Sequence, residues 1–231
     1  MNPRHIGNHQ EHGEGDLFMF AFIELVASLA VLACLWLKWK TDGISIPHAL
    51  VRVPPDAVLV HTYKPTNGEI PDRGQAVLER GWLLAEYYKR PLLLVCGHTV
   101  PGEKRTEGAM YRDYALRNFG DAVNILLGED PAVRDTAGET KEAIRIARTL
   151  DARHLLVIAS RPHLYRVSAL WQNIQRNFAG LRRNDLYVVF YGEQCPAEYY
   201  LWEFTMLILE KFLPVGSRRR DFVLNLVGRR G

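Results

Sequence analysis

The chain has 231 residues, of which 48% are hydrophobic and 24% charged, and its formal net charge is +3. This length allows one domain with a buried core and an appendage. So small a charge excess provides no broad basic field, and we expect no nucleic-acid polymer as a partner. Three cysteines, Cys34, Cys96 and Cys195, are too few and too scattered to form a disulfide framework, and they do not indicate a redox compartment.

The N-terminal region predicts a membrane anchor. Residues 1–16 are rich in Gly, His, Asn and Glu, which predicts a disordered leader. Residues 17–37, LFMFAFIELVASLAVLACLWL, are almost wholly apolar. They provide the roughly 20 residues that a bilayer-spanning helix needs, which is more than the apolar core of a signal peptide. With Trp36 and Trp39 at the interface, we predict an uncleaved single-pass helix in the cell membrane. The alternative is a helix packed on the domain.

The charges that flank this segment bear on its orientation. Lys38, Lys40 and Arg52 follow the segment, whereas only Arg4 precedes it. Positive-inside counting then places the domain in the cytoplasm, by a margin of about two charges. The family resemblance described below points the other way, so the side of the membrane is left open.

Short apolar runs alternate with helical patterns from residue 56 to residue 213, after a linker at residues 38–55. The expected strands cover residues 57–60, 92–96, 122–127, 155–159 and 186–191, and the expected helices cover residues 76–88, 107–119, 140–150, 164–178 and 197–213. Unbroken apolar strands are typical of a parallel sheet buried on both faces. We predict a doubly wound, mostly parallel, five-stranded Rossmann-like α/β sandwich with the strand order 3-2-1-4-5. Residues 214–231 predict a basic tail, either solvated or attracted to an anionic leaflet.

The candidate site follows from this topology, because ligands of open α/β sheets bind beyond the carboxyl ends of the strands. Polar side chains follow the predicted strands or open the next helix, namely His61, Arg73, His98, Glu107, Asp135, Thr136, Ser160, His163 and Arg166. Arg73 and Arg166 are expected to hold an anion, with Thr136, His61, His98 and Ser160 around it. His163 is the candidate acid or base, and Glu107 or Asp135 would orient it or serve as the base.

Structural alternatives exist for two of these assignments. Asp135 stands just before a predicted helix and is equally suited to be its N-cap. His163 and Arg166 lie three residues apart and share one helix face, so they also suit a structural pair.

No phosphate-binding glycine motif is present, and the sequence leaves the cofactor unknown. Zinc held by His61, His98 and His163, with Glu107 or Asp135, is an alternative. No metal-binding motif supports it, and we predict no metal.

Several stretches resemble one family. They are DAVLV from Asp56, LLLVCG ending at Gly97, EGAMYRDYA from Glu107, EDPAVRDTAGE from Glu129 and VIASRPHLYR ending at Arg166. Over residues 56–195 the chain resembles the DUF218 family of YdcF, SanA and ElyC-like proteins. The resemblance implies a Rossmann-like sandwich behind one or two membrane helices, a link to bacterial envelope integrity and cell-wall metabolism, and a ligand-binding or enzymatic role of unsettled chemistry. It implies that SanA-like members face away from the cytoplasm.

The resemblance also assigns residues by position. Those that match the family's polar signature are Arg73, Glu107, Thr136, His163 and Arg166. The chain departs from the family where His61 and Thr62 replace glycines, where Cys96-Gly97-His98 replaces Ser-Gly-Gly, and where Glu139 replaces an Asn. The bulkier side chains would narrow the pocket or change its ligand.

Two functions are compatible with these observations. The first is a membrane-anchored protein that binds or processes an anionic small molecule, a nucleotide or an envelope precursor. The alternative is a non-catalytic membrane scaffold that binds envelope proteins through its aromatic last helix and basic tail. Whether the chain is an enzyme is left open.

Overall fold

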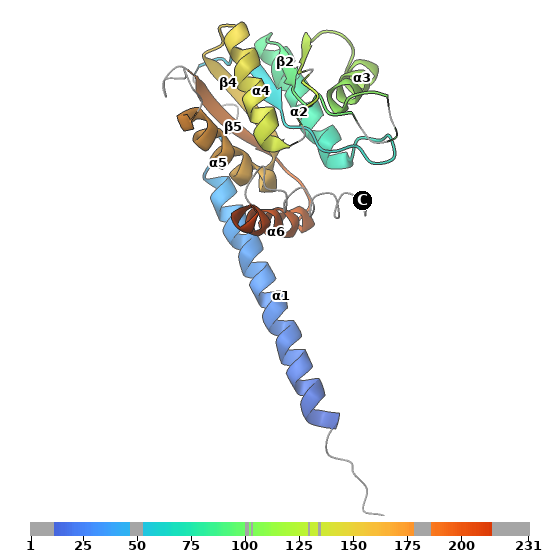
Figure 1. Ribbon diagram of the computed structural model, residues 1–231, viewed down its shortest axis with the longest axis vertical. Coiled ribbons are helices and arrows are strands. Elements are labelled where there is room, and N and C mark those ends of the chain that lie inside the picture. The colour runs from blue at the N-terminus through green and yellow to red at the C-terminus, as the bar shows by residue number, and fades with distance from the viewer. Residues whose placement is uncertain are drawn as a thin grey trace, which may run out of the picture.

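The computed structural model is an α/β sandwich from which one long N-terminal helix projects (Figure 1). It describes residues 12–46, 53–99, 102, 104–128, 130–133, 135–177 and 186–213. The elements are α1 (His12–Asp42), β1 (Ala57–Val60), α2 (Asp72–Tyr88), β2 (Leu92–Leu94), α3 (Glu107–Phe119), β3 (Ile125–Leu127), α4 (Thr136–Thr149), β4 (His154–Ser160), α5 (Arg161–Asn177), β5 (Tyr187–Glu193) and α6 (Glu198–Phe212).

The sheet has five strands, all parallel, in the order β3-β2-β1-β4-β5. This confirms the predicted fold class and strand order. In the centre, Val58 of β1 is paired with Leu92 of β2 on one side and with Leu156 of β4 on the other. The chain adds strands outward from β1 in one direction and then from β4 in the other, so the β1–β4 boundary is the topological switch point.

Each face of the sheet carries its own apolar core. On one face Val58 and Val60 pack with Leu78 and Trp82 of α2. On the other face Leu59 packs with a cluster from β4, α4 and α5. Because successive strand residues point to opposite faces, a strand covered by helices on both sides must be apolar at every position. This explains the unbroken apolar run that predicted β1.

Some predicted boundaries were wrong, for local reasons. Helix α2 begins four residues earlier than expected, because Pro71 occupies the N-cap and its fixed φ suits a helix start. Helix α4 begins at Thr136 because the Asp135 side chain accepts a hydrogen bond from the Gly138 N–H. Strand β3 keeps only the last three of the six residues predicted for it.

The N-terminal helix is also longer than expected. It begins inside the predicted leader, at His12, and it continues into the predicted linker as far as Asp42. Residues 1–11, residues 47–52 of the predicted linker and the tail at residues 214–231 lie outside the described residues. The span Met19–Asp42 is long and apolar enough to cross a membrane, and it is hardly buried.

Only the C-terminal end of α1 is docked on the domain. Leu37 and Thr41 are fully buried there. The Trp36 ring lies 5.4 Å from the ring of Tyr165 on α5, measured between centroids. Asp42 accepts a 3.0 Å ion-pair contact from Arg161. The alternative prediction, that the N-terminal helix packs on the domain, therefore holds only for the C-terminal end of α1. The rest of α1 projects away from the domain (Figure 1).

Candidate functional site

The carboxyl ends of β1 and β4 are joined by buried hydrogen bonds. The Tyr63 hydroxyl, in the loop after β1, donates to Ser160 Oγ at 2.7 Å and accepts from the Ser160 N–H at 2.9 Å. The Tyr111 hydroxyl bonds both the N–H and the carbonyl of Tyr63. The loop that follows β1 is thus held against β4 and α3, and the polar residues of three elements meet at the switch point.

His61 and Glu139 form the first buried pair of this site. Trp171 Nε1, which can only donate, lies 3.3 Å from His61 Nε2, so His61 Nε2 accepts. The proton of the imidazole is therefore on Nδ1, which lies 2.6 Å from Glu139 Oε2 and donates to it. Thr62 donates to the other carboxylate oxygen at 2.9 Å. Burial opposes ionisation of Glu139, but these bonds outweigh it and lower its pKa.

Glu107 is a second buried carboxyl group with the opposite tendency. It opens α3, whose N-cap Thr106 accepts from the Ala109 N–H. Burial raises the pKa of Glu107 to about 7, and the nearby Glu139 charge adds to the rise. Glu107 therefore holds a proton where Glu139 does not. Two carboxyl groups with pKa values driven apart are the arrangement that general acid–base catalysis uses.

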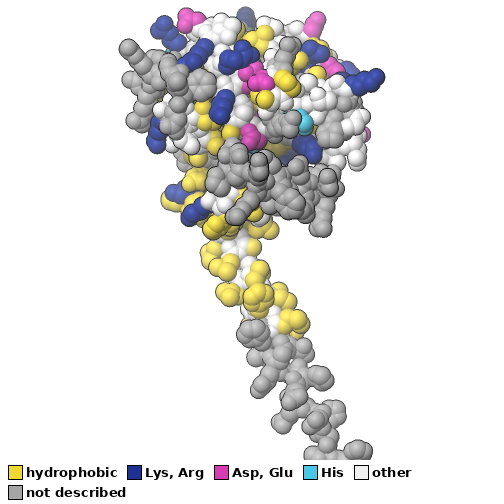
Figure 2. Space-filling view, viewed as in Figure 1, with side chains coloured by type: hydrophobic (Ala, Val, Ile, Leu, Met, Phe, Trp, Pro, Cys, Tyr) yellow, Lys and Arg dark blue, Asp and Glu magenta, His cyan; other side chains and the backbone are white. Residues whose placement is uncertain are grey.

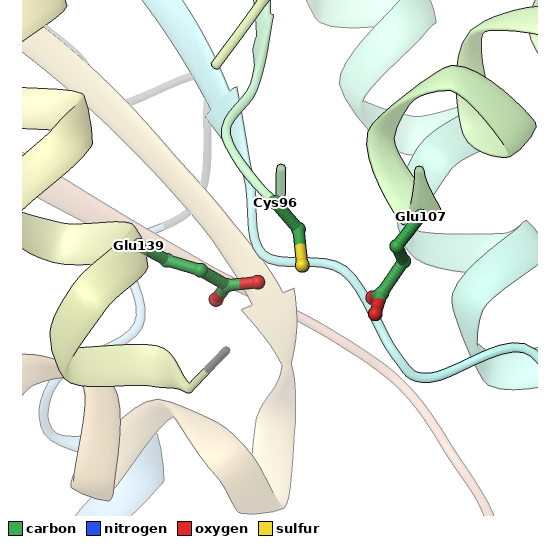
Figure 3. A group of neighbouring side chains, drawn as sticks. All are labelled: Cys96, Glu107 and Glu139. Carbon is green, nitrogen blue, oxygen red and sulfur yellow. The ribbon is translucent and has the colours of Figure 1, made fainter. Parts of the chain in front are cut away.

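Cys96 completes a group that could hold a metal. Figure 3 shows the Cys96 thiol between the carboxyl groups of Glu107 and Glu139, and the ligating atoms of all three lie within 4.8 Å of one another. Thiolate and carboxylate ligands suit zinc. However, burial raises the pKa of the Cys96 thiol, whose Sγ lies 3.7 Å from the Val133 carbonyl, and Glu139 is already bonded through both oxygens. The Cys96 thiol keeps its proton, and the Glu139 oxygens already accept hydrogen bonds. We therefore interpret these three side chains as an acid–base group and not as a metal site.

The three histidines considered as zinc ligands, His61, His98 and His163, do not point their ring nitrogens at a common position. The rings of His61 and His163 are 6.2 Å apart, and each has ring nitrogens bonded to protein groups. His98 is partly exposed, and it contributes its carbonyl, which accepts from the Glu107 N–H.

His163, Arg166 and Glu203 form the second buried cluster. Glu203 Oε2 lies 3.1 Å from His163 Nδ1 and 3.1 Å from Arg166 Nε. Burial opposes ionisation of Glu203, but His163 and Arg166 outweigh it and hold its pKa well below its usual range. Burial lowers the pKa of His163, which leaves a neutral imidazole at neutral pH. Its Nε2 lies 3.5 Å from the hydroxyl of Thr136.

Arg73 is the cation of this region that has no carboxylate contact in the structure as described. Its guanidinium lies 4.2 Å from the centroid of the Tyr63 ring and 4.6 Å from that of Tyr199. Its Nη1 is buried and has no hydrogen-bond partner among the described residues. A buried N–H without a partner costs about 1–3 kcal/mol, and more when the group is charged. Contact with the two tyrosine rings fixes the guanidinium plane, while Nη1 is left without an acceptor in the part of the chain that the structure describes.

The structure brings together most of the predicted site residues. Direct contacts or shared partners connect His61, Glu107, Thr136, Ser160, His163, Arg166 and, through Tyr63, Arg73. Asp135 caps α4, which is one of the two roles expected for it. His98 contacts the site through its backbone carbonyl, which accepts from the Glu107 N–H. Arg166 was predicted to hold an anionic ligand. In the structure it forms an ion pair with the Glu203 carboxylate instead.

Three contributors were missed in the sequence. Glu139 was noted as a departure from the family and not as a site residue, although a Glu in the first turn of a helix that follows a strand is a usable signal. Glu203 is the one carboxyl group between Glu198 and Glu210 in an aromatic, apolar helix, and an isolated charge in such a context points to a buried partner. Tyr63 gave no signal that distinguishes it from a core tyrosine.

Fold and site together define a class. This is a parallel, doubly wound α/β sandwich with a buried polar site at its switch point, preceded by a helix long enough to cross a membrane. The chain matches no protein-family model, and no curated protein matches it.

Proposed function

We propose that this chain is a membrane-anchored protein of the DUF218 type that binds and processes an anionic small molecule at the β1–β4 switch point. A nucleotide and a phosphorylated envelope precursor both have the required charge. The assignment to this family, and the role in bacterial envelope or cell-wall biogenesis, rest on the sequence resemblance of residues 56–195. The support for an anionic ligand comes from the site itself.

The observation that carries the proposal is the buried Nη1 of Arg73, which has no partner among the described residues. The other arginine of the site, Arg166, is paired with Glu203, whereas the Nη1 atom of Arg73 is buried and has no acceptor in the described part of the chain. A phosphate or carboxylate oxygen is the acceptor that a guanidinium edge binds best. The switch point of an open α/β sheet is where such ligands bind.

The neighbouring acid–base pair supports processing over binding alone. Glu107 carries a proton below a pH of about 7, so it is the candidate general acid. His163 is neutral and Glu139 is ionised, so each is a candidate base. His61 and Thr62 donate hydrogen bonds to Glu139, and Trp171 donates to His61, so these three act as positioning residues.

Thermal unfolding with anionic probes tests the proposal. Inorganic phosphate, pyrophosphate, a nucleoside diphosphate and a nucleotide sugar are added separately to the full chain in detergent, and unfolding is followed by tryptophan fluorescence. A probe at 100 times its Kd stabilises the folded state by about 2.7 kcal/mol. For a protein of this size, that raises Tm by roughly 5 to 11 °C.

The Arg73→Ala variant should lose this rise in Tm. The matched control is Arg80→Ala, on the same helix, because Arg80 is already paired with Glu193 at 2.8 Å. Arg80→Ala should keep the wild-type response to the probes. If no anion stabilises the wild type, or if Arg73→Ala responds as the wild type does, the proposal fails.

A further inference from the structure

Helix α6 exposes several large apolar side chains. Its buried side carries Tyr200, the carboxylate of Glu203 and Met206. Its outward side carries Leu201, Trp202, Ile208 and Phe212, whose exposed fractions are 46%, 43%, 43% and 74%. The exposed Thr205 lies between them. Its hydroxyl donates to the Leu201 carbonyl, so this hydroxyl has a hydrogen-bond partner without solvent. The exposed charges Glu198 and Lys211 stand in the first and last turns, so the middle of the outward face is apolar, whereas a helix on the surface of a soluble domain has polar groups there.

The exposed apolar face, defined as Leu201, Trp202, Ile208 and Phe212, lies beside the exit of α1. Helix α6 packs on α1, with Trp36 6.2 Å from Phe204 between ring centroids. Figure 1 shows α6 running across α1 at the base of the domain. Below this crossing, the apolar side chains of α1 are exposed on the stalk in Figure 2, and Leu29, Leu32 and Leu35 are each more than half exposed.

The length of α1 places the membrane surface at the same level. The backbone from residue 17 to residue 36 is about 30 Å long at the helical rise, which equals the thickness of the hydrocarbon core. At the domain end of this stretch stand Trp36, Trp39 and Lys40, with the Lys40 ammonium 4.4 Å from the centroid of the Trp39 ring. Tryptophans and lysines of this kind mark the interface between lipid and water. The apolar face of α6 is therefore at headgroup depth.

We propose that α6 is an interfacial helix whose exposed apolar face is embedded in the surface of the membrane that α1 crosses. The bilayer is the occupant that explains why an apolar face is placed at the exit of a membrane-spanning helix. The inference depends on α1 spanning a membrane and is independent of the anion proposed for Arg73. Because Glu203 lies on the opposite side of the same helix, the polar site is about 10 Å, one helix diameter, from the headgroups.

Spin-label depth measurement tests this proposal. The full chain, with Cys34→Ala and Cys195→Ser, is labelled at Thr205→Cys or Ile208→Cys and placed in nanodiscs of phosphatidylcholine and phosphatidylglycerol. Collisions of the label with oxygen, which concentrates in lipid, are compared with collisions with a water-soluble nickel chelate. Leu29→Cys in the stalk calibrates the lipid environment. Tyr87→Cys, on a side chain of α2 that is 73% exposed, calibrates water.

The labels on α6 should be more accessible to oxygen than to nickel, with values between those of the Leu29 and Tyr87 labels. Accessibility to nickel equal to that at Tyr87 would place the face in water and overturn the proposal. Low accessibility to both reagents would also overturn it, because that result means a protein cover, from residues 214–231, a second copy or a protein partner. Two labelled positions guard against one variant that fails to fold.

Discussion

Glu107 and Glu139 are two buried carboxyl groups of the same site that ionise in opposite ways. The difference comes from their neighbours. Glu139 accepts hydrogen bonds from His61 Nδ1 at 2.6 Å and from the Thr62 hydroxyl at 2.9 Å. Glu107 is instead buried beside the charge of Glu139. A single substitution at either carboxyl group should therefore alter the behaviour of the protein with pH.

The Glu107→Gln variant should remove a loss of stability that the wild type shows as pH rises. Below a pH of about 4.5 both the folded and the unfolded wild type hold the Glu107 proton. Between about 4.5 and 7 only the folded state holds it, so folding becomes less favourable as pH rises through this window. This difference between the folded and unfolded pKa of Glu107 corresponds to about 3 kcal/mol of unfolding free energy that the wild type loses by pH 8. The Glu107→Gln variant should not lose it.

Chemical unfolding of the detergent-solubilised chain between pH 4 and pH 8 measures this difference. Glu79→Gln, at an exposed glutamate of α2, is the control and should follow the wild type. A stability difference between Glu107→Gln and the wild type that does not change with pH would show that Glu107 is not the buried acid described here.

At the scale of elements, one buried carboxylate links α6 to α5. Glu203 lies between His163 and Arg166 of α5, and its side chain is 2% exposed. Removal of one partner from a buried ion pair costs about 3 to 5 kcal/mol, because the remaining charge has no counterpart. Helix α6 thus depends on the same residues as the site.

We expect Glu203→Ala to lower the free energy of unfolding by about 3 to 5 kcal/mol. Glu198→Ala, at an exposed position in the first turn of the same helix, should stay within about 0.5 kcal/mol of the wild type. Urea unfolding of both variants gives the comparison. Equal, small losses in the two variants would mean that the Glu203 cluster does not hold α6.

Elements whose signal is local could be predicted from the sequence, and contacts between distant elements could not. The unbroken apolar run of β1 indicated a central parallel strand, and Asp135 before an apolar periodic segment indicated an N-cap. The bond between His61 and Glu139 joins residues 78 positions apart, and that between His163 and Glu203 joins residues 40 apart. Neither pair has a fixed spacing that a sequence pattern can express. The predicted role of Arg166, binding an anionic ligand, required that no carboxylate of the protein lie beside it. The packing of α6 places Glu203 there, and the sequence does not reveal this contact.

At the scale of the whole molecule, the N-terminal helix, α5 and α6 form one connected support beneath the site. Trp36 of α1 contacts Tyr165 of α5 and Phe204 of α6, and Asp42 contacts Arg161 at the start of α5. The same two helices carry His163, Arg166 and Glu203. The N-terminal helix α1 is therefore packed against the elements that position the polar residues of the site.

The most direct test of the account is a crystal structure of the full chain with pyrophosphate. The account predicts an anion at the β1–β4 switch point, with an oxygen within hydrogen-bonding distance of Arg73 Nη1 and the guanidinium still stacked between Tyr63 and Tyr199. An Arg73 Nη1 that is bonded to an acceptor of the chain itself, with the switch point free of anion density, would contradict it.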